Sequence, residues 1–549
     1  MKQTEKKLNQ LFADAIRKNW AEPAFSDYQG ETYSYEDIGK KIKFLHKFLN
    51  EAGIKAGDKI ALIGSNSSLW GITYLGILTY GAVAVPILPD FSTANIHHIV
   101  NHSDSKLFFC SPSIFERIEA GQLDQLLGII NLYTYGIFED KKGKLQPCLD
   151  KARQFCDEKP AKPIDIFYKD FDVEKTCMIS YTSGTSGFTK GVMLPRRSIL
   201  SNIIFAQDHM PLKPGDKIVS FLPMAHAFGL LFEFLFPVTS GCHITFLTRV
   251  PSPQIVTKAF GEIKPHLILS VPLVIEKIYK KRILPSIEKT VVKTMLKIPV
   301  LSGIIENKVV QKLTDTFGQR FLEVVIGGAP LSEDVELFFK KIGFRFTIGY
   351  GMTECGPLIT YEGWEKARFR SAGKIVDRMQ IKIATEKNNA DGIGEILVKG
   401  KNLMLGYYKN PEATKDSFTK DGWLKTGDLG YLDKDGYLYI KGRSKNMILG
   451  PSGQNIYPEE LEAKVSNLPY VQECVVKYHD EKLIAMIYPD REAMENEKLS
   501  FENIQLLMDD NLKHLNKELP KYEQISSFEL VDEEFSKTPK RNIKRYLYL

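Results

Sequence analysis

The sequence lacks the features that mark several classes of protein. Its seven cysteines are scattered with no CxxC pair, which disfavours a zinc site or a disulfide framework and favours a reducing, cytoplasmic setting. The longest apolar run, residues 75–89, is interrupted by glycine and proline and is shorter than the roughly 20 residues that a membrane-spanning helix needs. No apolar stretch follows the lysine-rich start, so a signal peptide is not expected.

The excess of basic over acidic residues is small. The 73 lysines and arginines stand against 67 aspartates and glutamates, and the formal net charge of +6 is too mild for 549 residues to indicate a nucleic-acid partner. Apolar residues make up 43% and charged residues 26%, the balance of an ordinary globular protein. The length exceeds what one hydrophobic core usually serves and predicts at least two domains.

Two common functional motifs are incomplete. The GxG at residues 349–351 has no third glycine at dinucleotide spacing, so a Rossmann NAD site is poorly supported. Residues 97–102, HHIVNH, place His98 and His102 one helical turn apart, but no HExxH pattern follows. We therefore expect an ordinary amphipathic helix there and not a metal site.

The pattern along the chain predicts two units. From residue 32 to about residue 247, short β-branched runs alternate with longer amphipathic stretches, which predicts βαβ units and a partly parallel sheet. Residues 272–318 are rich in helix formers, and strand and turn patterns then continue to residue 453. We place the boundary near Lys445, which gives a unit of residues 1–444 and a smaller unit of residues 445–549.

One stretch is distinctly basic. Residues 273–301 carry seven lysines and arginines and two glutamates. We interpret them as a solvated helical face, because most runs of like charge are solvated. The alternative is a surface that rests on anionic lipid and gathers an amphiphilic substrate, which would make the protein peripheral at the inner face of the membrane.

The densest cluster of glycines and hydroxyls lies at residues 181–193, YTSGTSGFTKGVM. Glycines let successive backbone N–H groups face one anion, hydroxyls add donors, and Lys190 adds a charge, so the stretch suits a polyphosphate. It is not a Walker A loop, because a threonine precedes the lysine and a glycine follows it. A P-loop kinase or GTPase is therefore disfavoured.

Further clusters follow at residues 327–331 (GGAPL), 348–354 (IGYGMTE) and 426–428 (TGD). Two strand-end glycine turns could wall a planar ring on which Tyr350 stacks, and a glutamate nearby could hold a hard cation. The TGD carboxylate suits a ribose diol, and the guanidinium of Arg443 suits ribose or phosphate.

These clusters, in this order, resemble the adenylate-forming (AMP-binding) superfamily of acyl-CoA synthetases, peptide adenylation domains and luciferases. The likeness includes FLPMAHAFG, KTGDLG and KGRSKNMI and spans nearly the whole chain. Within the superfamily the chain is most similar to bacterial long-chain fatty-acid CoA ligases. The resemblance implies an α/β fold, with a large N-terminal domain of mixed sheets and flanking helices and a small mobile α+β C-terminal domain.

The resemblance also implies a reaction: a fatty acid attacks the α-phosphate of Mg·ATP to give an acyl-adenylate and pyrophosphate, and coenzyme A then displaces AMP. The phosphates would be held by Thr182, Ser183, Gly184, Thr185, Ser186, Gly187, Thr189 and Lys190, and Mg²⁺ by Glu354 and Thr182. The nucleoside and α-phosphate would be held by Gly327, Gly328, Ala329, Gly349, Tyr350, Gly351, Met352, Thr353, Asp428 and Arg443. His226 would lie beside the acyl carboxylate, and Lys445 would be the hinge.

The tail departs from the superfamily pattern. In SKTPKRNIKR, Asn542 stands where the catalytic lysine belongs, and an amide brings no charge. Lys540 or Lys544 could supply it, since Lys544 lies two residues along an extended segment on the same side as Asn542. Alternatively the protein adenylates slowly, or it is an impaired nucleotide or acyl-adenylate binder. An acyl carrier protein in place of coenzyme A is a further alternative.

The resemblance and the apolar stretch at residues 228–236 predict a long acyl tunnel. Acids of 12 to 18 carbons are therefore expected to outperform acetate.

Overall fold

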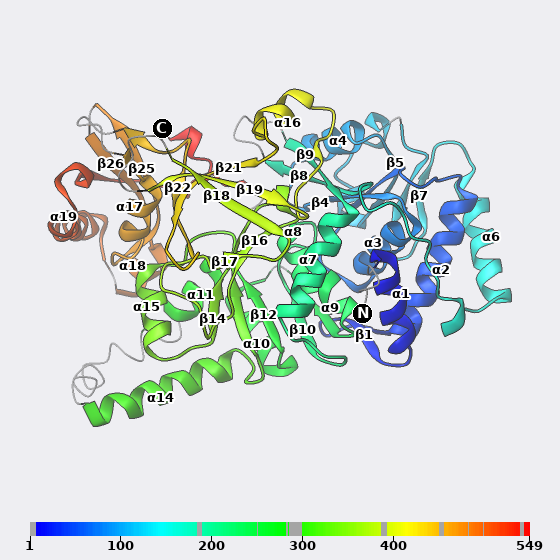
Figure 1. The fold of residues 1–549 in the computed structure, drawn as a ribbon, viewed down its shortest axis with the longest axis horizontal. Coiled ribbons are helices and arrows are strands. Elements are labelled where there is room, and N and C mark those ends of the chain that lie inside the picture. The colour runs from blue at the N-terminus through cyan, green and yellow to red at the C-terminus, as the bar shows by residue number, and fades with distance from the viewer. Residues whose placement is uncertain are drawn as a thin grey trace.

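The computed structural model describes residues 7–123, 125–183, 189–249, 251–280, 284, 299–385, 392–449, 455–480, 482–497, 499–538 and 543–548. The described residues form two hydrophobic cores. The larger core takes residues from Leu8 to Leu438, and the smaller takes residues from Ile456 to Phe528. Figure 1 shows the C-terminal elements, in orange and red, gathered at one end of the molecule.

The largest sheet has eight strands in the order β20-β9-β8-β4-β3-β5-β6-β7. The strands β8, β4, β3, β5 and β6 run parallel, and antiparallel strands lie at both edges. Their bounds are β3 Lys59–Ile63, β4 Val83–Ile87, β5 Ser105–Cys110, β6 Gly128–Asn131, β7 Ile137–Asp140, β8 Thr176–Ser183, β9 Thr189–Pro195 and β20 Gly406–Tyr407. The predicted partly parallel sheet of βαβ units is confirmed.

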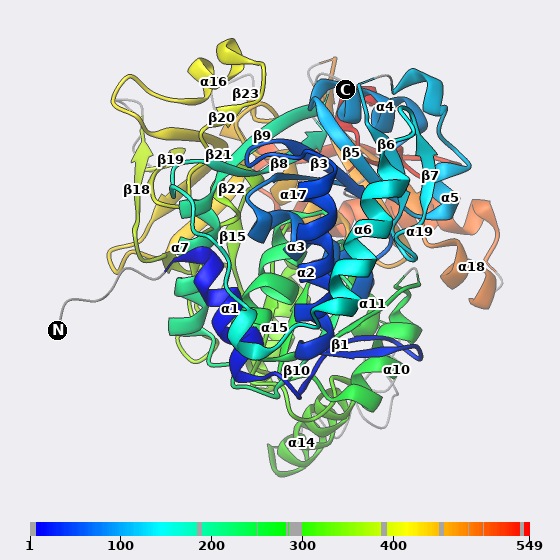
Figure 2. The same cartoon turned by 90° about the vertical axis from the view of Figure 1, so that its right-hand side faces the viewer.

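Helices α2 (Tyr35–Glu51), α3 (Ser68–Tyr80) and α6 (Leu145–Glu158) lie side by side over this sheet, as Figure 2 shows. The helix α3 is apolar on every side because it is buried between α2 and the sheet. Its ends are set locally: the Ser67 side chain accepts a hydrogen bond from Trp70 N, and Gly81 ends the helix at φ +95°. The apolar run at residues 75–89 is thus the end of α3 followed by β4.

Four smaller sheets complete the large unit. One is β10-β11-β1-β2, with β1 Pro23–Asp27, β2 Thr32–Ser34, β10 Lys217–Ser220 and β11 His243–Phe246. A parallel sheet holds β12 Leu267–Ser270, β13 Glu323–Ile326 and β14 Phe346–Ile348. Two antiparallel sheets hold β15 Tyr350–Gly351, β16 Leu358–Tyr361 and β17 Lys374–Ile375, and β18 Met379–Ala384, β19 Gly394–Gly400, β21 Leu424–Leu432 and β22 Leu438–Arg443.

The remaining helices flank these sheets. They are α1 Leu8–Lys18, α4 Thr93–His102, α5 Pro112–Phe115, α7 Arg196–His209, α8 Ala227–Gly229, α9 Phe236–Thr239, α10 Pro253–Ile263, α11 Pro272–Ile278, α14 Pro299–Thr316, α15 Glu333–Lys341 and α16 Pro411–Ser417. In Figure 1, α14 extends away from the body of the molecule. Most of the basic stretch at residues 273–301 lies outside the described residues. None of the helices described is both long and apolar enough to span a membrane.

The C-terminal elements surround the sheet β25-β26-β27. Their bounds are β23 Ile448–Leu449, β24 Asn455–Ile456, α17 Pro458–Val465, β25 Val471–His479, β26 Lys482–Pro489, α18 Arg491–Glu497, α19 Phe501–Glu518 and β27 Ile525–Leu530. They contact the rest of the chain through polar bonds, including Lys441 Nζ to Glu460 Oε1 at 2.8 Å and Ser332 Oγ to Asn467 Oδ1 at 2.6 Å. The predicted mixed α/β architecture is confirmed.

Candidate functional site

The three strands of the parallel sheet β12-β13-β14 end at the same edge. Ser270 pairs with Ile326, and Ile326 pairs with Ile348, so the residues after each strand leave side by side. Parallel sheets bind ligands at this carboxyl edge. The predicted glycine turns at residues 327–329 and 349–351 both lie there, as the sequence analysis expects.

Gly327 lies where three segments meet. A Cβ added to it would lie 3.3 Å from the Phe228 ring and 3.6 Å from the Gly349 carbonyl oxygen. The segment after β13, the segment that carries His226, and the turn before Tyr350 are therefore neighbours. A side chain at position 327 would crowd the flat surface that the glycine leaves.

Tyr350 joins this edge to the antiparallel sheet β18-β19-β21-β22. Its hydroxyl donates to Asp428 Oδ2 at 2.5 Å, and Arg443 Nε lies 2.8 Å from Asp428 Oδ1. Asp428 and Arg443 are also register partners on β21 and β22. Burial raises the pKa of Asp428, while the positive charge of Arg443 opposes that rise. Burial also raises the pKa of Tyr350, so its phenol stays protonated and donates.

The predicted phosphate loop begins and ends on a β-hairpin. Thr182 pairs with Lys190, and Ser183 with Thr189, at the end of β8 and β9 where the chain passes from one strand to the other. The hydroxyl oxygen of Thr189 is buried and has no hydrogen-bond partner among the described residues. Gly184, Thr185, Ser186 and Gly187 lie outside the described residues.

Glu354 lies beside this hairpin, on the short 3₁₀ helix Thr353–Cys355 that follows Met352. Its backbone oxygen accepts from Met404 N at 2.8 Å, and its carboxylate Oε1 accepts from the Tyr407 hydroxyl at 2.9 Å. Burial and the Glu354 charge raise the pKa of Tyr407, so this phenol also donates. The sequence analysis missed Tyr407, and its only sequence signal is its place in GYYKN after a β-rich stretch.

A magnesium ion fits this arrangement. Mg²⁺ keeps several waters and uses one or two protein oxygen ligands together with substrate phosphates. Glu354 offers such an oxygen, because Tyr407 engages Oε1 while Oε2 makes no hydrogen bond or ion pair with the described residues. The described residues hold no group of three or more histidine, cysteine, aspartate or glutamate side chains suited to a metal. Any metal here would therefore depend on a phosphate-bearing ligand.

His226 lies at the N-terminus of α8, where its Nδ1 accepts from Phe228 N at 3.3 Å. Two residues that the sequence analysis missed hold the segment before it. Asn66 donates to Leu222 O at 2.7 Å, and the buried Glu233 accepts from the backbone N–H of residues 221 and 222 at 3.0 and 2.9 Å. Burial raises the pKa of Glu233 well above its ordinary value.

Three of the four aromatic residues in the apolar stretch at residues 228–236 are fully buried, namely Phe232, Phe234 and Phe236. The fourth, Phe228, is partly exposed. Phe234 packs on Phe25 and Phe246 in the core, with ring centroids 5.6 and 6.1 Å away. Aromatic runs of this kind pack the core, which sequence alone does not distinguish from a tunnel wall. The expected tunnel therefore gains no support from these three residues.

The structure describes two of the four C-terminal residues predicted for the site, Lys445 and Lys544. Lys445 is exposed just after β22, and Lys540 and Asn542 lie outside the described residues. Lys544 donates its backbone N–H to Ser536 O at 2.8 Å, and its ammonium group makes no hydrogen bond or ion pair with the described residues. The next residue, Arg545, is anchored to Glu462 and donates to Val476 O at 2.8 Å.

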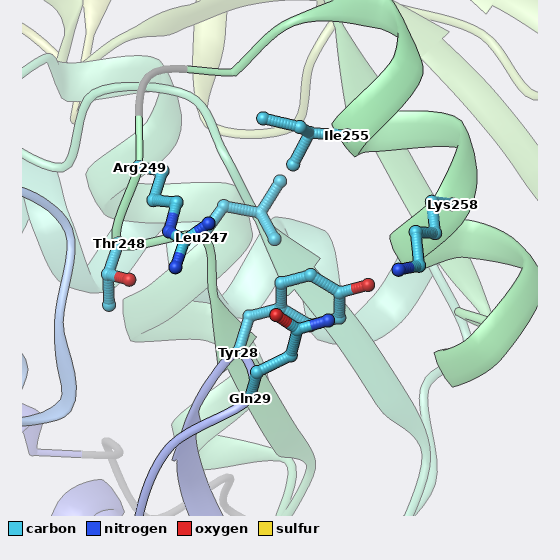
Figure 3. A pocket seen from close by; sticks show the side chains of 7 residues that line it. All are labelled: Tyr28, Gln29, Leu247, Thr248, Arg249, Ile255 and Lys258. Atoms are coloured by element: carbon cyan, nitrogen blue, oxygen red, sulfur yellow. The ribbon is translucent and has the colours of Figure 1, made fainter.

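A separate cavity, shown in Figure 3, contains none of the predicted site residues. It lies among Tyr28, Gln29, residues 247–249 and the side chains of Ile255 and Lys258, and its volume is about 110 Å³. Ligand pockets usually enclose about 300–1,000 Å³, so this cavity is too small for a nucleotide or a long acyl chain. The rings of His98 and His102 stack on α4 with their centroids 5.3 Å apart.

The chain is similar in sequence to known proteins over most of its length. Residues 12–408 match the model of the AMP-binding enzyme family. The chain is 28% identical over 476 residues to the long-chain-fatty-acid–CoA ligase FadD15 of Mycobacterium bovis, covering 81% of this chain and 75% of that protein.

Two solved structures share the fold. The anthranilate CoA ligase AuaEII in complex with anthranoyl-AMP matches with a TM-score of 0.78 at 19% identity, over 99% of this chain and 96% of that one. O-succinylbenzoate coenzyme A synthetase from Bacillus subtilis with ATP and a magnesium ion matches with a TM-score of 0.75 at 20% identity, over 99% of both chains.

Proposed function

The chain belongs to the AMP-binding enzyme family, and from this premise we propose that it activates a long-chain fatty acid with ATP and transfers the acyl group to coenzyme A. In the first step a carboxylate oxygen bonds to the α-phosphorus, and the bond to pyrophosphate breaks. In the second step the coenzyme A sulfur bonds to the acyl carbon, and the bond to AMP breaks. The reaction is that of an AMP-forming acid–thiol ligase.

One observation carries this proposal: the polar groups suited to each part of ATP lie in one continuous arrangement. Lys190 rests on the Tyr407 ring, Tyr407 bonds to Glu354, and the segment that follows Gly349 places Tyr350 on Asp428. We assign the terminal phosphates to the hairpin of Thr182 and Lys190. The ribose is assigned to Asp428 and Arg443, and adenine to Tyr350 and the turn at residues 327–329.

The first step brings one anion onto another, so the groups around the phosphates must offset negative charge. Lys190 supplies one positive charge at a fixed place. Magnesium, held by Glu354, Thr182 and the phosphates, would supply further positive charge. Thr353 lies beside Glu354 and is assigned to the α-phosphate. His226, whose Nδ1 accepts from the backbone N–H of the Gly327 neighbour Phe228, is assigned to the carboxylate of the acid.

The acyl specificity is tested by a panel of acids in the ATP–pyrophosphate exchange assay. Acids of 12 to 18 carbons are expected to outperform acetate, because several relatives, FadD15 among them, are named long-chain ligases. A preference for acetate or an aryl acid would overturn the long-chain assignment. Replacing coenzyme A with acyl carrier protein in the complete reaction tests the acceptor, and faster transfer to the carrier protein would reassign it.

The same assay tests the alternative that Asn542 suggests, a nucleotide or acyl-adenylate binder without adenylation activity. Tight ATP binding without exchange for any acid would favour the binder. For the ligase, we propose that Lys540 or Lys544 replaces the missing charge, and the ammonium of Lys544, which pairs with none of the described residues, suits that role. Pyrophosphate release should then fall by on the order of 10²–10³ in K540A or K544A, while transfer from preformed acyl-adenylate persists. Unchanged release in both variants would exclude the rescue.

We also propose that residues 445–549 form a small domain that moves about Lys445. The exposed backbone at this residue lies between the two hydrophobic cores, and hinges consist of a few such residues. The K445P variant restricts φ at this position and is expected to slow one half-reaction more than the other. Equal rates for both half-reactions in K445P and the native protein would contradict the hinge.

A further inference from the structure

Tyr407 lies between the two oppositely charged residues of the candidate site. It belongs to β20, which pairs with β9, the strand that carries Lys190. The Tyr407 hydroxyl donates to Glu354 Oε1 at 2.9 Å, and the Lys190 ammonium lies over the Tyr407 ring, 5.1 Å from its centroid. The Tyr407 side chain thus contacts the Glu354 carboxylate through its hydroxyl and the Lys190 ammonium through its ring face.

Lys190 and Glu354 do not form an ion pair with each other, although both are described residues and both contact Tyr407. A cation over an aromatic face is attracted by the ring and keeps its charge, whereas a direct ion pair with a carboxylate would cancel it. The hydroxyl bond likewise fixes one oxygen of the Glu354 carboxylate without placing a positive charge beside it. Both charges therefore remain available to a ligand.

We propose that Tyr407 is a positioning residue that keeps Lys190 and Glu354 apart, so that Lys190 meets the phosphates of ATP and Glu354 meets its magnesium ion. The inference rests on the proposed function, because it assumes that Mg·ATP binds here. Tyr407 touches neither the nucleotide nor the metal in this scheme. It acts by fixing the rotamer of Glu354 and by occupying the space through which the lysine would otherwise reach the carboxylate.

The backbone of β20 makes this placement rigid. Leu405 N donates to Met193 O at 2.9 Å and Tyr408 N donates to Gly191 O at 2.7 Å. The chain on both sides of Tyr407 is therefore hydrogen-bonded to β9. Met404 N donates to Glu354 O at 2.8 Å. The segment of residues 404–408, which carries the tyrosine, is therefore hydrogen-bonded to both segments that carry the charges, and the three groups keep their spacing.

Tyr408, the residue that follows β20, provides a matched control. Its hydroxyl donates to Asp104 Oδ2 at 2.7 Å, and the Lys59 ammonium lies 5.3 Å from its ring centroid. The Y408F variant thus loses the same kind of hydrogen bond to a carboxylate and keeps the same kind of cation contact. Asp104 and Lys59, however, are not candidate ligands of ATP or magnesium. Y408F and Y407F therefore share only the general loss of stability that follows from removing a hydroxyl group.

The test compares Y407F, Y407L and Y408F with the native protein in three measurements: thermal midpoint, nucleotide binding by calorimetry with and without magnesium, and the magnesium dependence of ATP–pyrophosphate exchange. Y407F keeps the ring under Lys190 and loses the bond to Glu354. Y407F should raise the magnesium concentration that gives half-maximal ATP–pyrophosphate exchange by on the order of tenfold, and it should leave the affinity for ATP in EDTA unchanged. Y407L should also weaken ATP binding in EDTA several-fold, because Lys190 can then pair with Glu354.

The Y408F variant should match the native protein in both binding measurements. Equal magnesium dependence in Y407F and Y408F would overturn the proposal, as would metal-free ATP binding that is the same in Y407L and the native protein. The E354A background guards against a general loss of structure, because Y407F should have no further effect on magnesium dependence there. An equal further effect in that background would show a merely structural role.

The binding measurements separate this inference from the proposed function. If the native protein exchanges pyrophosphate with no acid but binds Mg·ATP, the ligase assignment fails and the calorimetric comparison still decides the role of Tyr407. If the native protein binds no ATP, both are overturned.

Discussion

The ribose assignment makes a quantitative prediction for Asp428. In Asp428→Asn the side chain keeps its shape and loses its charge. The native carboxylate is 5% exposed and accepts from Tyr350 on one oxygen and lies against Arg443 on the other. The amide oxygen can still face Arg443, and the Tyr350 hydroxyl can turn to accept from the amide nitrogen. The fold should therefore persist.

The loss in D428N is the difference between bonds to a charged and to a neutral acceptor. A hydrogen bond to a charged group contributes about 1.5–3 kcal/mol and one to a neutral group about 1 kcal/mol. If the carboxylate also accepts a ribose hydroxyl, the variant should lose about 0.5–2 kcal/mol of nucleotide binding. This corresponds to roughly 2- to 30-fold in the dissociation constant for ATP.

Calorimetry with ATP and with 2′,3′-dideoxy-ATP isolates the contact. The native protein should bind the dideoxy nucleotide more weakly than ATP, and D428N should discriminate much less between the two, because the acceptor is already impaired. Gly261→Ala, a change on α10 with nothing within 4 Å of the added methyl group, is the control for handling and should bind both nucleotides as the native protein does. Full native discrimination retained in D428N would refute the ribose assignment.

Three further predictions concern stability. Burial lowers the pKa of His46 from 6.5 to about 4, so as the pH falls the unfolded chain binds this proton before the folded protein does. The unfolding free energy should therefore fall by about 3 kcal/mol between pH 7 and pH 4, and an H46N variant with the same dependence of unfolding free energy on pH would contradict this. Gly351→Ala places a methyl group 2.2 Å from the Pro357 carbonyl oxygen and should lower the thermal midpoint by several degrees, whereas G261A should not. Burial favours the protonated form of Glu233, so E233Q should change the unfolding free energy by less than about 1 kcal/mol. E233L leaves the N–H groups of residues 221 and 222 unpaired and should lower the unfolding free energy by about 2–6 kcal/mol in denaturant titrations; equal losses in the two variants would refute the role of Glu233 as their acceptor.

Much of the fold follows from local patterns. The alternation of short β-branched runs and amphipathic stretches predicted β3, α3 and β4, because periodicity and capping residues are properties of neighbouring positions. The sequence predicts that the aromatic stretch at residues 228–236 lines a tunnel. Phe234 in this stretch packs against Phe25 and Phe246 from distant strands, and local sequence does not show which surface covers an apolar segment.

The candidate site was predictable where glycine and hydroxyl clusters follow strands, and less so where contacts join distant segments. The sequence suggests Tyr350 for stacking, but its hydroxyl bond to Asp428 spans 78 residues. Tyr407 reaches Glu354 across 53 residues and Asn66 reaches Leu222 across 156. Each depends on the order of strands in a sheet, which the spacing of motifs does not encode. Nothing in the residue type or local sequence of Tyr350, Tyr407 and Asn66 indicates these hydrogen bonds, which are seen only in the folded structure.

The polar groups of the site are already bonded within the protein, and this favours a role in positioning charge. Asp428 is held by Tyr350 and Arg443, and Glu354 by Tyr407. Groups fixed in this way do not need to be reordered when a ligand binds, and catalysis of anion transfer depends on such preorganised charge. Lys190 differs, because a ring and not a carboxylate lies beneath its ammonium group. Its charge is located without being neutralised, which is the state in which a lysine attracts phosphate most strongly.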